Sequence, residues 1–202
     1  MQHLRQRGLD RNTLVVITAD HGESLGEHGL MAHGSSLYRE LIHVPLILWQ
    51  PGKIPAGKRI DTPVSLTSIP ATLLEEAGEA EHPHFPQPSL AGLLSGGASP
   101  VALPDPISQL AQLPWHPTFP DYYGPMESVS TLHWHYIRGG KEGEELFACC
   151  DQEPEQLNLA GTVVGRELAM RFDRELASAA GERRETRNEQ PGKSGICQRS
   201  SQ

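Results

Sequence analysis

Two short runs of the chain are apolar at almost every position. Residues 13–18 (TLVVIT) and residues 44–49 (VPLILW) contain no charged residue. Such runs are typical of strands buried on both faces, as in a parallel sheet covered by helices. Residues 1–9 precede the first run and predict the end of an amphipathic helix that stops at Gly8.

Helical spacing of apolar residues predicts further helices. Ser36 and Glu40 stand near the positions of a capping box, which predicts a helix over residues 36–42. Residues 65–77 have apolar residues at helical intervals and are followed by Gly78, a common helix stop. Another amphipathic helix is predicted for residues 164–179, with one apolar stripe formed by Leu168, Phe172 and Leu176.

The remaining segments differ in character. Residues 127–148 alternate between apolar and polar side chains around a glycine-rich turn, which predicts an antiparallel hairpin. Residues 59–63 predict a short strand or sheet edge. Residues 79–125 hold many prolines and glycines without a regular period, so a long irregular loop is expected. From Gly181 onward the chain is polar and charged, and disorder is expected.

This order of elements predicts an α/β fold, in which a mixed sheet with helices is followed by a small antiparallel sheet and a C-terminal helix. We expect residues 1–125, with the irregular loop 79–125, to belong to the α/β layer. Residues 126–180 are expected to form a small α+β subdomain, and residues 181–202 a disordered tail. The loop after residues 13–18 would lie at the carboxyl end of a strand, where such sheets bind ligands.

Composition and charge exclude several classes of protein. The 202 residues carry a formal net charge of −8 without a long basic run, which argues against nucleic-acid binding. The cysteines, Cys149, Cys150 and Cys197, form no C-x-x-C pair, so neither a zinc site nor a disulfide framework is predicted. The first ten residues lack the apolar core of a signal peptide, and no apolar run is long enough to span a membrane.

Acidic and histidine side chains gather where the first apolar run ends. Asp20, His21 and Glu23 are followed by His28 and His33 in a glycine-rich loop. A carboxylate oxygen suits Ca²⁺, Mg²⁺ or Mn²⁺, and an imidazole suits a transition metal or a hydrogen bond to an oxyanion. The same residues also suit a polar surface loop with an Asx-type turn. The residues alone therefore leave both interpretations open.

Longer stretches resemble the sulfatase family of the alkaline-phosphatase-like superfamily. The similarity begins with the D-H-G-E, G-E-H-G and H-G groups of residues 20–34 and continues through L-Y-R-E and V-P-L in residues 37–46. It extends to VSLTSIPATLLEEAG (64–78), to P-S-L and L-L-S-G in residues 88–96, and to E-L-F, P-E and N-L-A in residues 145–160. The resemblance implies a partial alkaline-phosphatase-like mixed sheet, from the C-terminal part of a sulfatase.

The resemblance also implies roles for single residues. Asp20 would be a ligand of a divalent metal, usually calcium, and His21 would lie at a neighbouring metal-ligand or sulfate-contacting position. His33 falls where many members have a lysine that contacts the sulfate, although a loop histidine that caps backbone is the alternative. Glu23 and His28 are expected to be structural. No role is assigned to His43, His82, His84, His116, His133 and His135.

The nucleophile of the family is not encoded in this sequence. Sulfatases carry a C-x-P-S-R or S-x-P-S-R motif whose Cys or Ser becomes formylglycine, whereas SIPAT (68–72) lacks the arginine. The family's pair of acidic metal ligands after an N-terminal strand is absent as well. We therefore expect no meaningful ester hydrolysis by this chain alone. We also expect exposed apolar sheet edges and the need for a complementary N-terminal segment.

The expected parent activity is hydrolysis of a small-molecule or carbohydrate sulfate ester with a divalent metal. Two alternatives stay open: a phosphoesterase or phosphoglycerol or phosphoethanolamine transferase of the same superfamily, or a non-catalytic truncated paralogue. The similarity after residue 65 favours the sulfatase. Members of the family are often periplasmic, secreted or lysosomal, and the localisation of this chain stays open.

Overall fold

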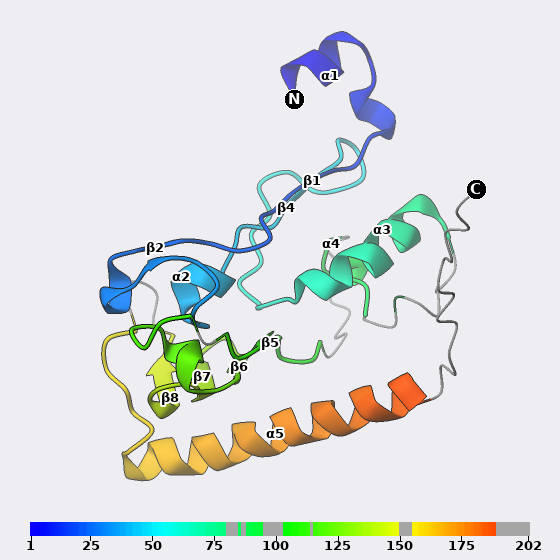
Figure 1. The fold of residues 1–202 in the computed structure, drawn as a ribbon. Helices are drawn as coiled ribbons and strands as arrows, with labels where there is room; N and C mark the ends of the chain where they lie inside the picture. The colour runs from blue at the N-terminus through cyan, green and yellow to red at the C-terminus, as the bar shows by residue number, and fades with distance from the viewer. Residues whose placement is uncertain (80–84, 86–87, 95–102, 114, 150–154, 189–202) are drawn as a thin grey trace, which may run out of the picture.

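A computed structural model of the chain describes residues 1–79, 85, 88–94, 103–113, 115–149 and 155–188. Of residues 182–188 it describes the backbone alone. In the described part, the strands form antiparallel sheets of two, two and four strands, with short helices between them and a long helix at the end (Figure 1). The predicted mixed α/β fold with a small sheet and a C-terminal helix is confirmed.

The two apolar runs form a narrow ribbon. Strand β1 (Val15–Ile17) pairs antiparallel with β4 (Ile47–Trp49), and Figure 1 shows the ribbon leading to the N-terminal helix α1 (Gln2–Gln6), away from the rest of the chain. Ile17 and Ile47 are 47% and 53% exposed. The expected burial in a parallel sheet is wrong, because no further strand of the described part pairs with the ribbon.

The histidine-rich loop contains a small hairpin. Strands β2 (Ser24–Leu25) and β3 (Met31–Ala32) pair around the 3₁₀ turn η2 (Glu27–Gly29). Helix α2 (Arg39–Ile42) follows and is capped by Tyr38 rather than Ser36, so the predicted capping box is wrong. The reason is tertiary: Ser36, Leu37 and Tyr38 are all buried, and the extended backbone at Tyr38 carries its ring into a core.

The next helix agrees with the sequence. The 3₁₀ turn η3 (Leu66–Ser68) leads into α3 (Ile69–Ala77), which ends at Gly78 in the left-handed conformation that glycine adopts readily. Helix α4 (Ala91–Leu94) lies beside α3, because the Leu90 N–H donates to the buried Thr72 hydroxyl at 2.9 Å. Residues 59–63 form no strand, so that expectation is wrong.

A four-stranded antiparallel sheet is the largest sheet in the described part of the chain. Its order follows the sequence: β5 (Ile107–Leu110), β6 (Met126–Ser130), β7 (Trp134–Gly139) and β8 (Gly143–Ala148). The predicted hairpin with its glycine turn is confirmed in β7 and β8. Strand β5 lies within residues 79–125, so that segment is not irregular throughout. The four residues of this strand are too few to show a period. The division of the chain at residue 125 stays a prediction.

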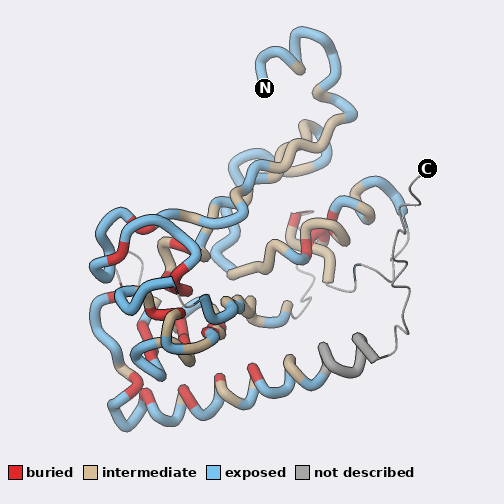
Figure 2. Tube along the Cα trace, viewed as in Figure 1, coloured by how far each residue is buried: buried red, intermediate tan, exposed pale blue. Residues whose placement is uncertain are grey.

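Helix α5 (Val163–Asn188) lies along this sheet (Figure 1). Figure 2 shows buried positions recurring along its length, and its stripe packs on a core of Val129, Tyr136 and Leu146. The helix continues beyond Gly181, so the expected disorder is wrong as far as Asn188. Residues 182–188 are mostly good helix formers, and polarity alone does not end a helix. Residues 189–202 lie outside the described residues. None of the described helices is both long and apolar enough to cross a membrane.

The packing of α5 gives a direct test of the sheet core. Phe172 is fully buried on the stripe, whereas Met170 lies exposed on the same helix. Phe172→Ala should lower the free energy of unfolding by about 3–5 kcal/mol, because it leaves a cavity against the sheet. Met170→Ala should change it by less than about 0.5 kcal/mol. Urea unfolding of both variants measures the difference, and equal losses would contradict this packing.

Candidate active-site wall

The loop after β1 is fastened to helix α2 through Gly22. The Gly22 N–H donates to the Leu41 carbonyl at 2.8 Å. A side chain at position 22 would place its Cβ only 1.9 Å from the Glu40 carbonyl oxygen. Glycine is therefore required here for the close approach of two backbones, and this approach sets the direction of Asp20 and His21.

Asp20 and His21 lie side by side on the surface. The Asp20 side chain is 89% exposed, and its Oδ1 accepts the His21 N–H at 3.0 Å. These hydrogen bonds from the backbone of His21 and of Asp20 itself lower the pKa of the carboxyl, so it is ionised at neutral pH. His21 Nδ1 lies 2.9 Å from the Gly22 carbonyl and must donate to it. In the neutral ring Nε2, 3.7 Å from Asp20 Oδ2, then carries a free lone pair.

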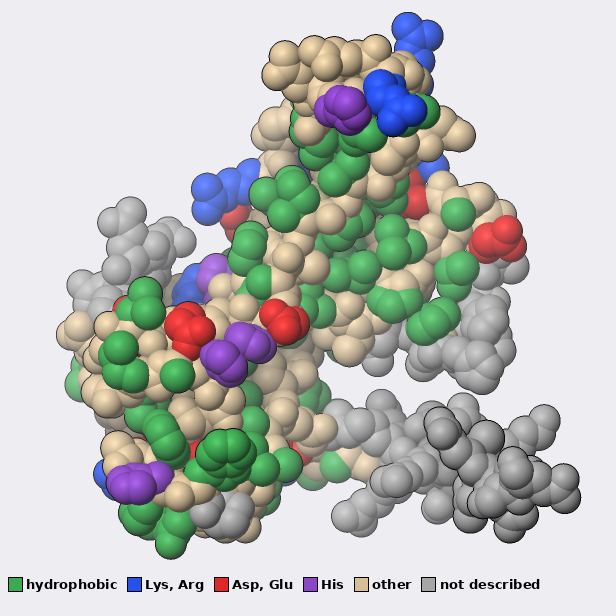
Figure 3. Space-filling model, turned by 45° about the horizontal axis from the view of Figure 1, so that its top comes forward, with side chains coloured by type: hydrophobic (Ala, Val, Ile, Leu, Met, Phe, Trp, Pro, Cys, Tyr) green, Lys and Arg blue, Asp and Glu red, His purple; other side chains and the backbone are tan. Residues whose placement is uncertain are grey.

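His33, which directly follows strand β3 of the hairpin, lies close to this pair. Its ring stacks on that of His21 with centroids 4.3 Å apart, and its Nδ1 lies 3.1 Å from Glu23 Oε2. The return turn uses left-handed backbone at Ala32 and Gly34. Figure 3 shows histidine side chains in contact with one another beside acidic side chains on an open face. Asp20, His21 and His33, the residues to which the family resemblance gives roles, therefore lie close together.

The Asp20 carboxylate fits part of a calcium site. Ca²⁺ takes about six to eight oxygen ligands, whereas Asp20 offers carboxylate oxygens and His21 one ring nitrogen. Within the described residues, no third acidic or histidine side chain lies close enough to complete a three-residue set with them. Asp20 is thus suited to be one ligand among several, and further oxygens are needed from elsewhere.

Behind the loop lies a group of buried polar residues that sequence reasoning missed. The Tyr38 hydroxyl donates to Glu145 at 3.0 Å, and the Arg39 N–H donates to Glu155 at 2.9 Å. His135 donates through Nδ1 to the other oxygen of Glu155. These contacts tie the start of α2 to the four-stranded sheet. The only signal in the sequence was the family-like E-L-F and P-E groups in residues 145–155, because His135 alone resembles an ordinary hairpin histidine.

Electrostatics distinguishes the two buried carboxylates. Burial raises the pKa of Glu145. Burial also acts to raise the pKa of Glu155, but the hydrogen bond and the charge of His135 outweigh it and lower the pKa. Glu155 is therefore stabilised as a buried anion by its partners, whereas burial makes ionisation of Glu145 less favourable than in water.

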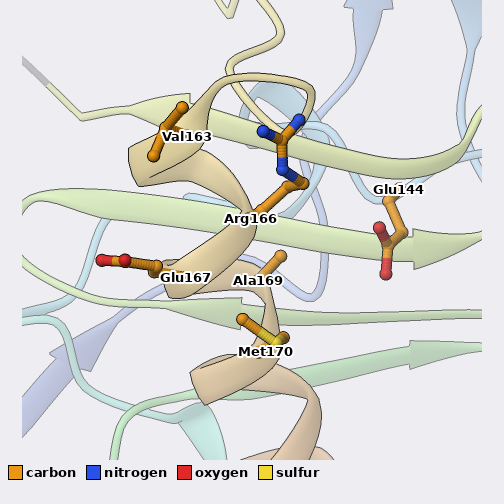
Figure 4. Close-up of a pocket in the computed structure, with 6 residues that line it drawn as sticks. All are labelled: Glu144, Val163, Arg166, Glu167, Ala169 and Met170. Carbon is orange, nitrogen blue, oxygen red and sulfur yellow. The ribbon is translucent and has the colours of Figure 1, made fainter.

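A shallow pocket elsewhere is a poor candidate for the site. Figure 4 shows its lining side chains on the first turns of α5 and on β8: Glu144, Val163, Arg166, Glu167, Ala169 and Met170. These side chains point in different directions, and none belongs to the loop. Nothing there brings catalytic groups to one point.

Comparison with known proteins identifies the family. The family model "Sulfatase" matches residues 1–79. Arylsulfatase K of Xenopus laevis is 30% identical over 185 residues, which cover 87% of this chain and 32% of that protein. Delta 4,5-hexuronate-2-O-sulfatase of Bacteroides thetaiotaomicron is 33% identical over 156 residues, covering 74% and 31%. The chain belongs to the sulfatase family.

Solved structures show the same fold. A 2-O GAG sulfatase superposes with a TM-score of 0.77 at 24% identity, covering 94% of this chain and 40% of that one. A phosphonate monoester hydrolase from Silicibacter pomeroyi (TM-score 0.73, 24% identity) has it too. So does a protein solved in complex with its substrate D-glucosamine-2-N,6-O-disulfate (0.70, 22%). This sulfatase-family chain spans about a third of the length of the curated relatives it matches.

The close approach of the loop and α2 backbones at Gly22 leaves no room for a side chain at this position. Gly22→Ala should destabilise the protein by about 1–3 kcal/mol, because the backbone of the loop or of α2 must move. Gly161→Ala is the matched control, since its Cβ would enter open space without left-handed backbone. Thermal unfolding measures both variants. A neutral Gly22→Ala would show that the loop is not fastened to α2.

The ionised Glu155 predicts an acid-sensitive fold. Its pKa is lower in the folded than in the unfolded chain, so its stabilising contribution is present above the unfolded value of about 4.3 and is lost as the pH falls through the lower folded value. Between about pH 6 and pH 3, the wild type should therefore lose more stability than Glu155→Gln. Urea unfolding at several pH values gives both slopes, and parallel slopes would contradict the assignment.

Proposed function

We propose that this chain supplies one wall of the active site of a sulfuric-ester hydrolase. The observation that carries the proposal is the convergence of Asp20, ionised and exposed, with the stacked rings of His21 and His33. A sulfate ester is an anion, so its recognition needs hydrogen-bond donors and a cation. This wall offers imidazole donors and a carboxylate suited to a cation.

Each residue has a distinct part in this proposal. Asp20 would hold a divalent metal, Ca²⁺ by family resemblance, and the bound metal would neutralise charge on the sulfate. His21 would use the lone pair of Nε2 as a further metal ligand, or would donate to a sulfate oxygen from a protonated Nε2, because its Nδ1 already donates to the Gly22 carbonyl. His33, whose Nδ1 faces Glu23, would donate to a sulfate oxygen through the Nε2 of its protonated ring.

The reaction also needs groups that residues 1–202 do not encode. We propose that the chain corresponds to the C-terminal part of a sulfatase domain, and that turnover requires a complementary segment carrying the formylglycine precursor and the remaining metal ligands. The partly exposed ribbon of β1 and β4 supports this, because another strand could pair along it.

A carbohydrate sulfate ester is the proposed substrate class. Its support is the names of relatives, which include a hexuronate-2-O-sulfatase and a protein solved with a disulfated glucosamine. A phosphorus ester is the second candidate, because a phosphonate monoester hydrolase has the same fold. A hydrogen bond from His33 favours neither ester by itself, because a sulfate and a phosphonate both offer oxygen acceptors.

The decisive experiment restores a complete domain. This chain would be joined to the nucleophile-bearing segment of its hexuronate-2-O-sulfatase relative and assayed on sulfated sugars, an aryl sulfate and an aryl phosphonate. Asp20→Asn should lower kcat for sulfate hydrolysis at least about 100-fold, and His33→Gln about 10- to 100-fold. The exposed His116, remote in sequence, serves as the control, and His116→Gln should leave the rate unchanged.

Two results would contradict the proposal. Full activity of Asp20→Asn would exclude Asp20 as a metal ligand, and a preference for the aryl phosphonate would favour the phosphorus ester. Calorimetry on the chain alone should show weak or no binding of Ca²⁺, because Asp20 has too few oxygen partners among the described residues.

A further inference from the structure

A second set of metal-ligating side chains lies behind the loop, separate from Asp20. It consists of His28 from η2, Glu40 from α2 and Glu155, which follows the four-stranded sheet. One ligand atom from each residue lies within 4.8 Å of the others. Three segments distant in the sequence therefore meet at one point, and each contributes a group that can bind a metal ion.

The charges of this cluster are incompletely balanced by the protein. The side chains of His28, Glu40 and Glu155 are only 16%, 19% and 4% exposed. Two carboxylates in so little water repel one another and lose solvation. The carboxyl of Glu40 accepts a long hydrogen bond from Ser24 at 3.5 Å and lies 4.0 Å from His28 Nε2, and burial raises its pKa in spite of a backbone hydrogen bond that lowers it.

The orientation of the ligands is already fixed by neighbouring groups. The His28 ring stacks on Tyr38 with centroids 3.6 Å apart and planes 4° from parallel. Glu155 is held by the Arg39 N–H and by His135, one on each oxygen, and each oxygen keeps a second lone pair. A cation would thus find two of its ligands held in place by packing and hydrogen bonds.

We propose that His28, Glu40 and Glu155 bind a divalent transition-metal ion, Zn²⁺ or Mn²⁺. One imidazole and two carboxylates suit these ions better than calcium, which prefers oxygen alone. The two negative charges match the charge of the ion. Ligand atoms around tetrahedral Zn²⁺ lie about 3.4 Å apart, so the cluster would contract slightly on binding. The partly exposed side of His28 and Glu40 gives the ion a path of entry.

The bound ion would join the hairpin, α2 and the end of the sheet. Because His28 lies in the same hairpin that brings back His33, the metal would order the candidate active-site wall without touching substrate. This site does not depend on the sulfatase reaction, and it shares no residue with the proposed calcium position at Asp20.

The test compares metal binding in matched variants. After removal of metals with a chelator, the chain and its variants would be titrated with Zn²⁺ and with Mn²⁺ by calorimetry. We expect a single site in the wild type, with Kd at least about tenfold weaker in Glu40→Gln and in His28→Gln. Asp20→Asn and His33→Gln are the controls and should bind as the wild type does.

A measurement on the wild type locates the ion without any substitution. Bound Mn²⁺ should broaden the ring resonances of Tyr38 and His135 before those of His21. Unchanged affinity in both Glu40→Gln and His28→Gln would overturn the proposal. So would loss of binding confined to the Asp20 and His33 variants, or broadening centred on His21.

Discussion

The arrangement of this chain depends on the burial of Leu37 and Tyr38 against the four-stranded sheet. Both side chains enter a core with Met126, Ile137 and Phe147, and the Tyr38 hydroxyl finds Glu145 at 3.0 Å. Burying a residue of this size outweighs a helix cap, which is worth about 1 kcal/mol. Helix α2 consequently begins at Arg39, where its first N–H meets Glu155. The core thus places the loop on the sheet, and the polar contacts fix its orientation.

Acidic side chains gather behind this contact. Glu40 of α2, Glu145 of β8 and Glu155, which follows the sheet, all lie at low exposure between the loop and the sheet. The negative charge of Glu155, whose pKa is lowered, favours a cation on the loop side, at the cluster around His28. The histidines face this negative region from the loop. The buried acidic side chains therefore contribute to the electrostatic potential at the candidate active-site wall.

Local sequence patterns predicted the positions of helices and strands better than they predicted how these elements pair and how deeply they are buried. The hairpin of β7 and β8, helix α3 with Gly78, and the stripe of α5 all follow from period and glycine placement. The pairing of β1 with β4 could not be predicted, because an apolar run does not indicate which strand it pairs with. The family resemblance gave His21 and His33 roles at one site, and the structure stacks their rings. The partnership of His135 with Glu155 joins a strand to a distant loop and leaves no local signal.

The loop after β1 is positioned mainly by contacts of its own residues, and less by strand β1. Strand β1 has three residues, pairs only with β4 among the described strands, and lies in an exposed ribbon. The direction of Asp20 comes instead from the Gly22 N–H on Leu41, and that of His33 from the turn at Gly34 and from stacking on His21. Helix α2 is in turn attached to the four-stranded sheet and the segment after it through the hydrogen bonds of Tyr38 and Arg39. The sequence predicts residues 126–180 to be a small separate subdomain. In the structure, this segment helps to position Asp20, His21 and His33.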